Sequence, residues 1–215
     1  MKKFELTSEC ITFFGRKLFR VRALIEFGDI KAGALGGYIE KEENLSQSGN
    51  AWVYGDARVY GDAQVYGDAW VYGDAQVCGD ARVCGNAEVY GDAQVYGDAW
   101  VYGDAWVYGD AQVCGDARVY GDAQVCGDAE VYGNADYAYV HGFGSCFRTT
   151  TFFRLKDGGI GVRCGCFYGT LQEFRDKVQE THKNTKKARE YLMLADLMEL
   201  RFSKEAEDED GKSDN

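Results

Sequence analysis

The sequence predicts an all-β solenoid, a long thin rod of stacked coils, from three observations. Valine occupies every sixth position from Val53 to Val131, which makes fourteen consecutive hexapeptides. A strict short period of this kind is typical of solenoids, whose repeats cannot bury a core alone and therefore stack on one another. The repeated unit reads Ala-x-Val-Tyr/Cys-Gly-Asp, and the 215-residue chain has no proline, so every repeat amide can donate to a β-ladder.

Alternation within each hexapeptide separates an inner from an outer face. In a short strand, Ala and Val share one face, while x and the Tyr or Cys share the other. Because x is Trp, Arg, Gln or Glu, the face with Ala and Val is the core. Gly and Asp form the turn: Gly tolerates unusual dihedrals, and the Asp carboxylate can accept hydrogen bonds from nearby backbone amides.

The pattern Val-x-x-x-Ala-x over residues 51–135 resembles the hexapeptide-repeat proteins. The resemblance implies a left-handed parallel β-helix of about five to six triangular coils, with three hexapeptides per coil and residues 18 apart stacked. On this register the third outer face places Trp100 between Arg82 and Arg118, which predicts a cation–π sandwich.

The first outer face combines a tryptophan column with a tyrosine column. Its aromatic residues are Trp52, Trp70, Trp106, Tyr54, Tyr72, Tyr90 and Tyr108. A stripe this apolar is larger than a soluble monomer normally exposes. We therefore expect a self-association surface and a homo-oligomer, a trimer as in the proteins that the chain resembles, with a ligand or protein site as the alternative.

Segments on either side of the repeat predict caps for the open ends of the core. The expected organisation is a small N-terminal β cap (1–45), the β-helix (46–140), a C-terminal β-hairpin with two helices (141–202) and a disordered acidic tail (203–215).

Local signals place the elements of these caps. Strands Ile11–Phe14 and Leu18–Leu24 are expected around a Gly15–Lys17 turn, and Gly28–Ser46 is expected to lead into the first coil. In the C-terminal cap, strands at 149–155 and 160–166 flank a Gly-containing turn, a capping box at 170–173 opens one helix, and a second helix runs from about 185 to 202.

The caps also resemble a group of bacteriophage, prophage and gut-bacterial hexapeptide-repeat proteins. The matching segments are Phe27-Gly28-Asp29-Ile30-Lys31-Ala32-Gly33, Gly36-Gly37-Tyr38-Ile39-Glu40 and Cys164-Gly165-Cys166-Phe167-Tyr168-Gly169-Thr170. This resemblance implies a module that binds, assembles or interferes with host defence in the host cytoplasm.

Charge is unevenly distributed along the chain, whose net charge is −11. Twelve aspartates from Asp56 to Asp128 line the predicted corners, so direct binding of nucleic acid is not expected. Such a rod can instead imitate DNA to a DNA-binding protein, or its carboxylates simply cap turn amides and keep the rod soluble. The C-terminal cap is basic, and its candidate anion-binding residues are Arg148, Arg154, Arg163, Lys186 and Lys187.

Catalytic machinery and metal sites are not expected. Hexapeptide-repeat acyltransferases use a histidine on a coil as general base, whereas residues 51–135 contain none and His141 lies just beyond them. Zinc can be held by Cys and His, but a Cys-x-Cys pair without a second paired motif is a weak signal. The Cys and His residues concerned are Cys146, Cys164, Cys166 and His182.

Location is predicted from what the chain lacks and from its cysteines. No segment has the apolar run needed to span a membrane, and Met1–Cys10 has no hydrophobic stretch of a secretion signal. No two repeat cysteines are 18 apart, so they are expected to be free thiols in a reducing compartment, the cytoplasm. These cysteines are Cys78, Cys84, Cys114 and Cys126.

Three functional classes follow. The first is a non-catalytic oligomeric binding protein of phage type that binds a host protein or sequesters a signalling nucleotide. The second is an acidic DNA mimic that inhibits a DNA-binding protein. The third is an acyl- or nucleotidyl-transferase of the hexapeptide-repeat type. The first class is the one we expect, and no cofactor is expected.

Overall fold

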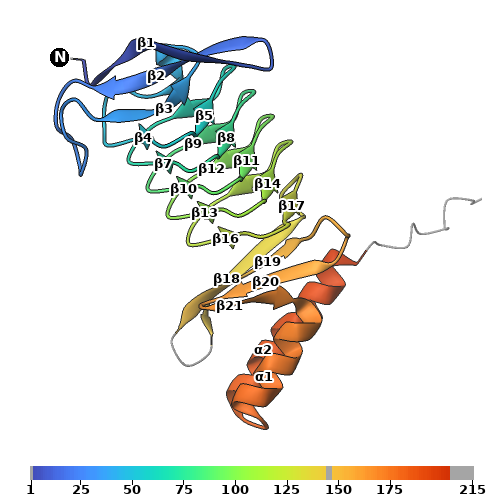
Figure 1. Ribbon diagram of the computed structural model, residues 1–215. Coiled ribbons are helices and arrows are strands. Elements are labelled where there is room, and N and C mark those ends of the chain that lie inside the picture. The colour runs from blue at the N-terminus through green and yellow to red at the C-terminus, as the bar shows by residue number, and fades with distance from the viewer. Residues whose placement is uncertain (1, 144–146, 204–215) are drawn as a thin grey trace, which may run out of the picture.

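A computed structural model describes residues 2–143 and 147–203 and has the predicted solenoid, a stack of about five coils capped at both ends (Figure 1). Each hexapeptide supplies one two-residue strand, in the order β4 (Trp52–Val53), β5 (Arg58–Val59), β6 (Gln64–Val65), β7 (Trp70–Val71), β8 (Gln76–Val77), β9 (Arg82–Val83), β10 (Glu88–Val89), β11 (Gln94–Val95), β12 (Trp100–Val101), β13 (Trp106–Val107), β14 (Gln112–Val113), β15 (Arg118–Val119), β16 (Gln124–Val125) and β17 (Glu130–Val131).

Strands 18 residues apart pair in parallel, which confirms the predicted stacking. Glu88 pairs with Trp70 on one side and Trp106 on the other. The first face is the sheet β4-β7-β10-β13-β16, and the third face is β6-β9-β12-β15. The second face, β5-β8-β11-β14-β17, continues into the N-terminal cap as one eight-stranded sheet.

The core and corners follow the hexapeptide. Every Ala and Val from Ala51 to Val131 in the repeat is at most 1% exposed, as the alternation predicts. The corner glycines stack directly on one another with positive φ. A Cβ on Gly85, whose φ is +70°, would lie 2.9 Å from the backbone nitrogen of Gly103. The corner therefore accepts no side chain at this position.

The corner aspartates do not cap their own turns, contrary to one expectation. The backbone N–H of Asp74 donates to Gly91 O, and that of Asp92 donates to Gly109 O, both in the next coil. Of the twelve corner carboxylates, Asp68 alone accepts a backbone N–H within the described residues, from Asn50. The ladder between coils already satisfies these amides, so the carboxylates remain in solvent.

The N-terminal hairpin starts earlier in the chain than predicted, and the solenoid sheet begins within the predicted cap. Strands β1 (Phe4–Phe13) and β2 (Arg16–Ala23) form an antiparallel hairpin whose turn is Phe14-Gly15, both at positive φ. Strand β3 (Leu35–Ile39) then pairs in parallel with β5, so the solenoid sheet begins before residue 46. Ile39 stacks on Val59 at a spacing of 20 rather than 18, which hides this coil from a six-residue count.

Side-chain donors close the N-terminal end of the rod, where backbone carbonyls lack a preceding coil. The Lys3 ammonium, 2% exposed, donates to Ala51 O at 2.9 Å and to Gly49 O at 3.3 Å. Asn44, at the end of a short 3-10 helix (Glu42–Asn44), donates to Gly61 O and Ala63 O. Both residues are buried polar groups with satisfied hydrogen bonds.

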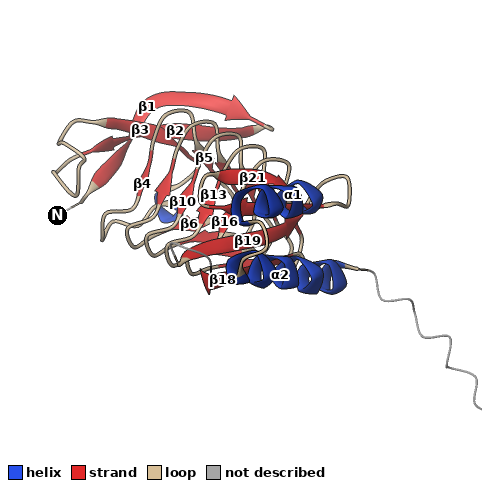
Figure 2. Ribbon diagram, turned by 90° about the horizontal axis from the view of Figure 1, so that it is seen from below, coloured by secondary structure: helices blue, strands red, loops and turns tan. Residues whose placement is uncertain are grey.

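The C-terminal cap has the predicted hairpin and helices, in a four-stranded antiparallel sheet. Its strands are β18 (Tyr137–Phe143), β19 (Arg148–Arg154), β20 (Ile160–Cys164) and β21 (Phe167–Thr170). Helices α1 (Leu171–His182) and α2 (Lys186–Phe202) are N-capped by Thr170 and Thr185 and lie beside this sheet (Figure 2). Apart from Ser203, the predicted acidic tail lies outside the described residues.

Strand β19 joins the two hydrophobic cores of the molecule. Phe153 packs into the solenoid core, while its neighbour Phe152 packs with Phe174 and the helices on the opposite face. Since successive side chains of a strand point to opposite faces, one strand seals the rod and anchors the helices. None of the helices in the described part of the chain is both long and apolar enough to cross a membrane.

Placing a charge in the thin core will prevent folding. Val95 is fully buried, so Val95→Asp buries an unpaired carboxylate and we expect loss of the folded state. Gln94→Glu is the matched control, because the outward-facing Gln94 lies in a column that already holds Glu130. Circular dichroism during heating measures both variants. A soluble Val95→Asp protein with unchanged thermal stability would contradict the assigned register.

Lys3 makes folding depend on pH in the alkaline range. Burial lowers the pKa of Lys3 to about 8, so between about pH 8 and pH 9.5 the unfolded chain binds more protons and stability rises with pH. The expected slope is at most about 1.4 kcal/mol per pH unit. Urea unfolding of the wild type measures it, and Lys3→Met removes this component, whereas Lys2→Met, at an exposed ion pair with Glu42, retains it.

Candidate functional site

The third face carries a short ladder of cationic and aromatic side chains. The Trp100 ring lies between two guanidinium groups, with the Cζ atoms of Arg82 and Arg118 at 4.7 and 5.6 Å from the ring centroid. This confirms the sandwich predicted from the 18-residue register. The ladder puts two arginines on an otherwise acidic rod.

A cavity forms where the third face ends. Strand β15 is the last strand of this sheet, because the hexapeptide period stops after Ala135. Side chains replace the missing strand: Asn134 Oδ1 accepts the Arg118 backbone N–H at 2.9 Å, and the Tyr137 hydroxyl donates to Arg118 O. A cavity of about 520 Å³ remains beside them.

Tyrosines form the walls of this cavity. Tyr102 and Tyr120 stack at 5.3 Å with planes 14° apart, and Tyr120 meets the edges of Tyr137 and Tyr139 at 6.4 and 5.7 Å. Burial raises the pKa of Tyr137 and of Tyr139, so both hydroxyls stay protonated at neutral pH. The walls therefore offer ring faces without negative charge, while the Tyr137 hydroxyl already donates to Arg118 O.

Arginines from two distant parts of the chain line the same cavity. Arg118 comes from β15, and Arg201 comes from the last turn of α2, where its Nη2 donates to Asn134 O at 3.4 Å. Neither guanidinium has an ion pair within the described residues. Two uncompensated cations beside stacked tyrosines suit an anion that carries a planar ring.

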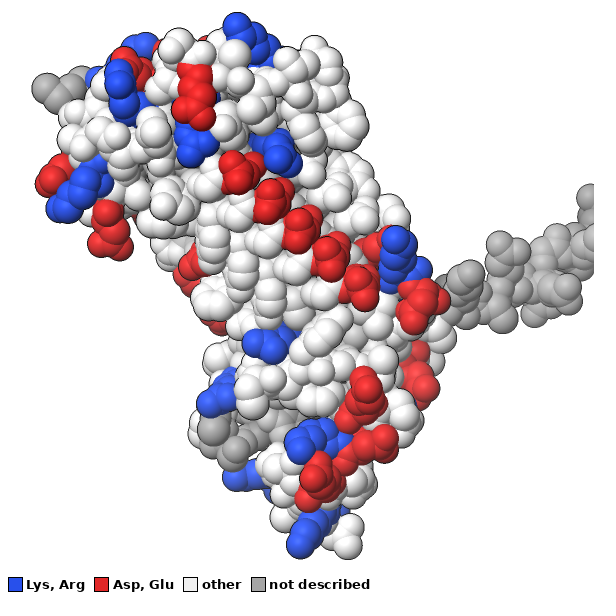
Figure 3. Space-filling model, viewed as in Figure 1, with Lys and Arg blue, Asp and Glu red and all other residues white. Residues whose placement is uncertain are grey.

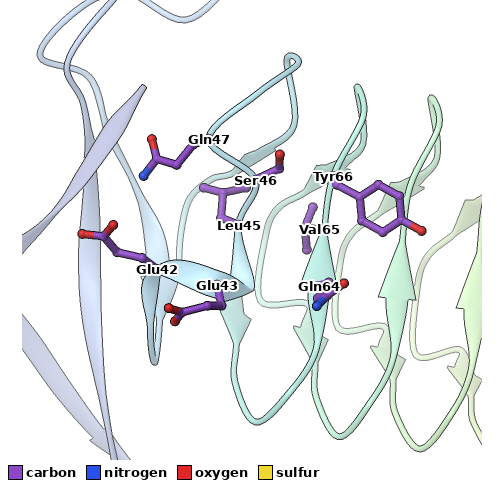
Figure 4. Close-up of a pocket in the computed structure, with 8 residues that line it drawn as sticks. All are labelled: Glu42, Glu43, Leu45, Ser46, Gln47, Gln64, Val65 and Tyr66. Atoms are coloured by element: carbon purple, nitrogen blue, oxygen red, sulfur yellow. The ribbon is translucent and has the colours of Figure 1, made fainter. Parts of the chain in front are cut away.

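The opposite end of the third face has a different character. A cavity of about 510 Å³ lies between the 3-10 helix and β6 (Figure 4). Glu42, Glu43, Gln47 and Gln64 are among its lining residues, and no lining residue is cationic. Of the two cavities on this face, the one at the C-terminal end is therefore the one with cationic lining residues.

One corner of the rod, between the first and second faces and away from the cationic third face, is a column of aspartates. The 18-residue stacking places Asp56, Asp74, Asp92, Asp110 and Asp128 in one column. Figure 3 shows a straight row of acidic side chains running along the solenoid. Within the described residues, no carboxylate of this column has an ion pair or hydrogen bond, unlike Asp62, which pairs with Lys41, or Asp104, which accepts from Asn86.

The predicted aromatic face is only partly exposed. Trp52 is fully buried, because Phe4 and Phe27 of the N-terminal cap pack edge-on against it, so this residue does not belong to an open surface. Tyr72, Tyr90 and Tyr108 stack in parallel at 4.8 and 4.9 Å. The most open aromatic residues of the face are Tyr54, 54% exposed, and Trp106, 39% exposed, while Trp70 is half-buried.

The predicted anion-binding residues of the cap do not come together. Arg154 pairs with Asp136 and donates to Phe202 O, and Arg163 donates to Gln124 and lies over Tyr108. Lys186 pairs with Glu190, which also lies on α2. The next residue, Lys187, is exposed. Arg148 lies at a separate cavity inside the C-terminal cap.

Three of the cysteine and histidine candidates lie at one cavity without forming a metal site among the described residues. Cys164, Cys166 and His182 all line the cavity in the C-terminal cap, but within the described residues no three Cys, His, Asp or Glu side chains gather as a metal site requires. Cys146 lies outside the described residues. His141 is exposed, 3.0 Å from Thr149 Oγ1 and 3.9 Å from the Asp122 carboxylate.

The repeat cysteines are free thiols, as the 18-residue register predicts. Each follows a tyrosine one coil earlier in its column, and burial raises the pKa of Cys114 and Cys126. These two thiols are accordingly held in the protonated form at neutral pH.

Sequence reasoning placed Arg118, Tyr102 and Tyr120 on the third face but missed the cavity residues that lie beyond the repeat. Arg201 and Tyr139 lie far from the repeat in the chain, and nothing in their local pattern places them beside β15. The one sequence feature that marks this end of the face is Asn134, which stands where most repeats have the corner aspartate.

Comparison with known proteins places the repeat but not the caps. The profile of a family described as the YdcK β-solenoid repeat matches residues 51–65, 63–79, 75–91, 93–109 and 111–127. The chain is thus similar to that family over much of its solenoid, which is less than half of its length. No match was found among curated proteins.

Removing the acceptor at Asn134 will destabilise the end of the third face. Asn134→Ala leaves the Arg118 backbone N–H without a partner, and we expect a loss of about 1–3 kcal/mol in the free energy of unfolding. Asn134→Asp, which retains an acceptor oxygen, should lose less. Urea unfolding compares the two, and equal losses would show that the hydrogen bond is not the cause.

Proposed function

We propose that this chain is a non-catalytic, self-associating binding protein that sequesters a ring-bearing anion of the nucleotide class. The observation that carries the proposal is the cavity at the end of the third face. It holds two guanidinium groups that have no ion pair with any described residue, beside stacked tyrosines, on a rod whose corners are acidic. A host protein that presents such an anionic group is the alternative ligand.

The chemistry of the cavity matches that ligand class. Guanidinium groups bind phosphate oxygens through paired hydrogen bonds, and aromatic side chains stack on bases with about 1–3 kcal/mol per base. The cavity volume of about 520 Å³ lies within the range of small-molecule sites. Asp116 and Asp122 occupy the corners on either side of Arg118, so the attraction for an anion here comes from the guanidinium groups of Arg118 and Arg201.

The origin of the chain is part of the same proposal. Kinship with hexapeptide-repeat proteins is supported by the unbroken period from Val53 to Val131. A phage-type role against host defence, in the host cytoplasm, is supported by the resemblance of residues 27–40 and 164–170 to segments of bacteriophage and prophage hexapeptide-repeat proteins. Sequestration of a host signalling nucleotide fits that role without requiring catalysis.

Nucleotide binding tests the proposal directly. AMP should bind the wild type more tightly than ribose 5-phosphate, which lacks the base, and Arg118→Gln with Arg201→Gln should weaken AMP roughly tenfold or more. Arg189→Gln, a cation on α2 outside the cavity, is the control. Titration calorimetry measures all four cases. Equal binding of AMP by the double variant and the wild type would overturn the proposed site.

Self-association is the second part of the proposal, supported by the exposed Trp106 and Tyr54 on the first face. Light scattering should give the mass of a trimer. Trp106→Glu should lower that mass, and it keeps the fold because Glu88 occupies the same place one coil earlier. Gln112→Glu on the second face is the control, because Glu130 occupies the same place one coil later. A monomeric wild type at micromolar concentration contradicts this part.

A second candidate function, DNA mimicry, is favoured by the spacing of the corner charges. Twelve aspartates distributed over about five coils, each rising about 4.8 Å, give one charge per about 2 Å of rod, against about 1.7 Å for DNA. Their carboxylates are almost free of backbone hydrogen bonds, so turn formation alone does not account for them.

Neutralising the corners separates the two candidates. The combined variant Asp92→Asn, Asp98→Asn, Asp104→Asn and Asp110→Asn should still fold, because Asn already occupies corners at Asn50 and Asn86. A DNA mimic releases DNA-binding proteins from immobilised DNA at low salt, and this variant should lose that activity. AMP binding should be unaffected. Turnover of an acyl or nucleotide donor that His141→Ala abolishes would instead favour a transferase.

A further inference from the structure

The C-terminal cap contains a second cavity that shares no lining residue with the one on the third face. It measures about 320 Å³ and lies between α1, α2 and the cap sheet. Arg148, Cys164, Phe167, Phe174, Lys177 and Tyr191 are among its lining residues. Neither the repeat nor the proposed nucleotide site makes use of it.

Aromatic rings give this cavity an apolar wall. Phe174 of α1 meets Phe167 at 5.6 Å and Tyr191 of α2 at 5.6 Å, the second contact being edge-to-face. His182 stacks on Tyr191 at 5.8 Å. Phe174, Val178 and Tyr191 are buried members of the cap core, so the wall is rigid and continuous with it.

One cation at the rim of the cavity, the exposed Arg148, lies over the turn between β20 and β21. A Cβ on Gly165 would lie 2.5 Å from Arg148 Nη1, so the lack of a side chain at residue 165 leaves room for the guanidinium over this turn. Within the described residues Arg148 has no ion pair. Lys177 also lines the cavity, but it already pairs with Glu180.

We propose that this cavity binds a small carboxylate with an apolar body. The aromatic wall takes the hydrocarbon part, and the Arg148 guanidinium takes the carboxylate through paired hydrogen bonds. The ligand's carboxylate provides the negatively charged partner that the Arg148 guanidinium does not have among the described residues. A small, largely apolar space with a single uncompensated cation suits a monoanion of this kind better than a nucleotide with its polar sugar and dianionic phosphate.

Octanoate and octanol are suitable probes, since they share a hydrocarbon chain and differ in charge. Octanoate should bind the full chain in titration calorimetry, and Arg148→Gln should weaken it roughly tenfold or more while leaving octanol unchanged. Lys187→Gln, an exposed cation outside the cavity, is the control for charge and should bind octanoate like the wild type.

Filling the cavity tests its location. Thr181→Trp, at an exposed lining position of α1, should weaken both probes, whereas Gln179→Trp, exposed on the same helix but outside the cavity, should weaken neither. Circular dichroism confirms that both variants fold. AMP binding should be the same in all these variants, so loss of AMP binding and loss of octanoate binding are separate outcomes.

Two results would overturn the proposal. One is the absence of octanoate binding to the wild type at millimolar concentration. The other is equal octanoate affinity in Arg148→Gln and the wild type, or in Thr181→Trp and the wild type.

Discussion

The hydrogen-bond ladder between successive coils is the constraint on which the rest of the structure depends. Each coil bonds to the next through groups such as the Tyr72 N–H and Val89 O, or the Asp74 N–H and Gly91 O. That ladder demands equal coils, so valine must return every sixth residue and glycine must stack on glycine at the corners. A rod built this way stabilises its middle and leaves unpaired backbone groups at its two ends.

The two ends solve this problem with opposite chemistry. Carbonyls are left over at the N-terminal end, and the donors Lys3 and Asn44 bond to them. Amides are left over at the C-terminal end, and the acceptors Asn134 and Thr151 bond to them. Side chains occupy less space than a strand, so the cavity beside Arg118 is a direct result of ending the ladder in this way.

The outward positions are free to vary because the ladder and the Ala–Val core do not use them. The first face uses this freedom for stacked tyrosines, the corners for carboxylates, and the third face for arginine and tryptophan. A uniform frame thus carries surfaces of different charge. The proposed nucleotide site and the acidic corners lie on the same coils without disturbing one another.

The hexapeptide pattern by itself determined the solenoid, its three faces and the Arg82–Trp100–Arg118 contact, because a strict period converts sequence distance directly into spatial distance. The capping box at Thr170 and the hairpin at 156–159 were local signals of the same dependable kind. Only the tertiary structure decided that Trp52 is buried, that β3 opens the solenoid, and that Arg201 meets Arg118. Those contacts join segments outside the period, and their positions depend on how the caps pack on the ends of the rod.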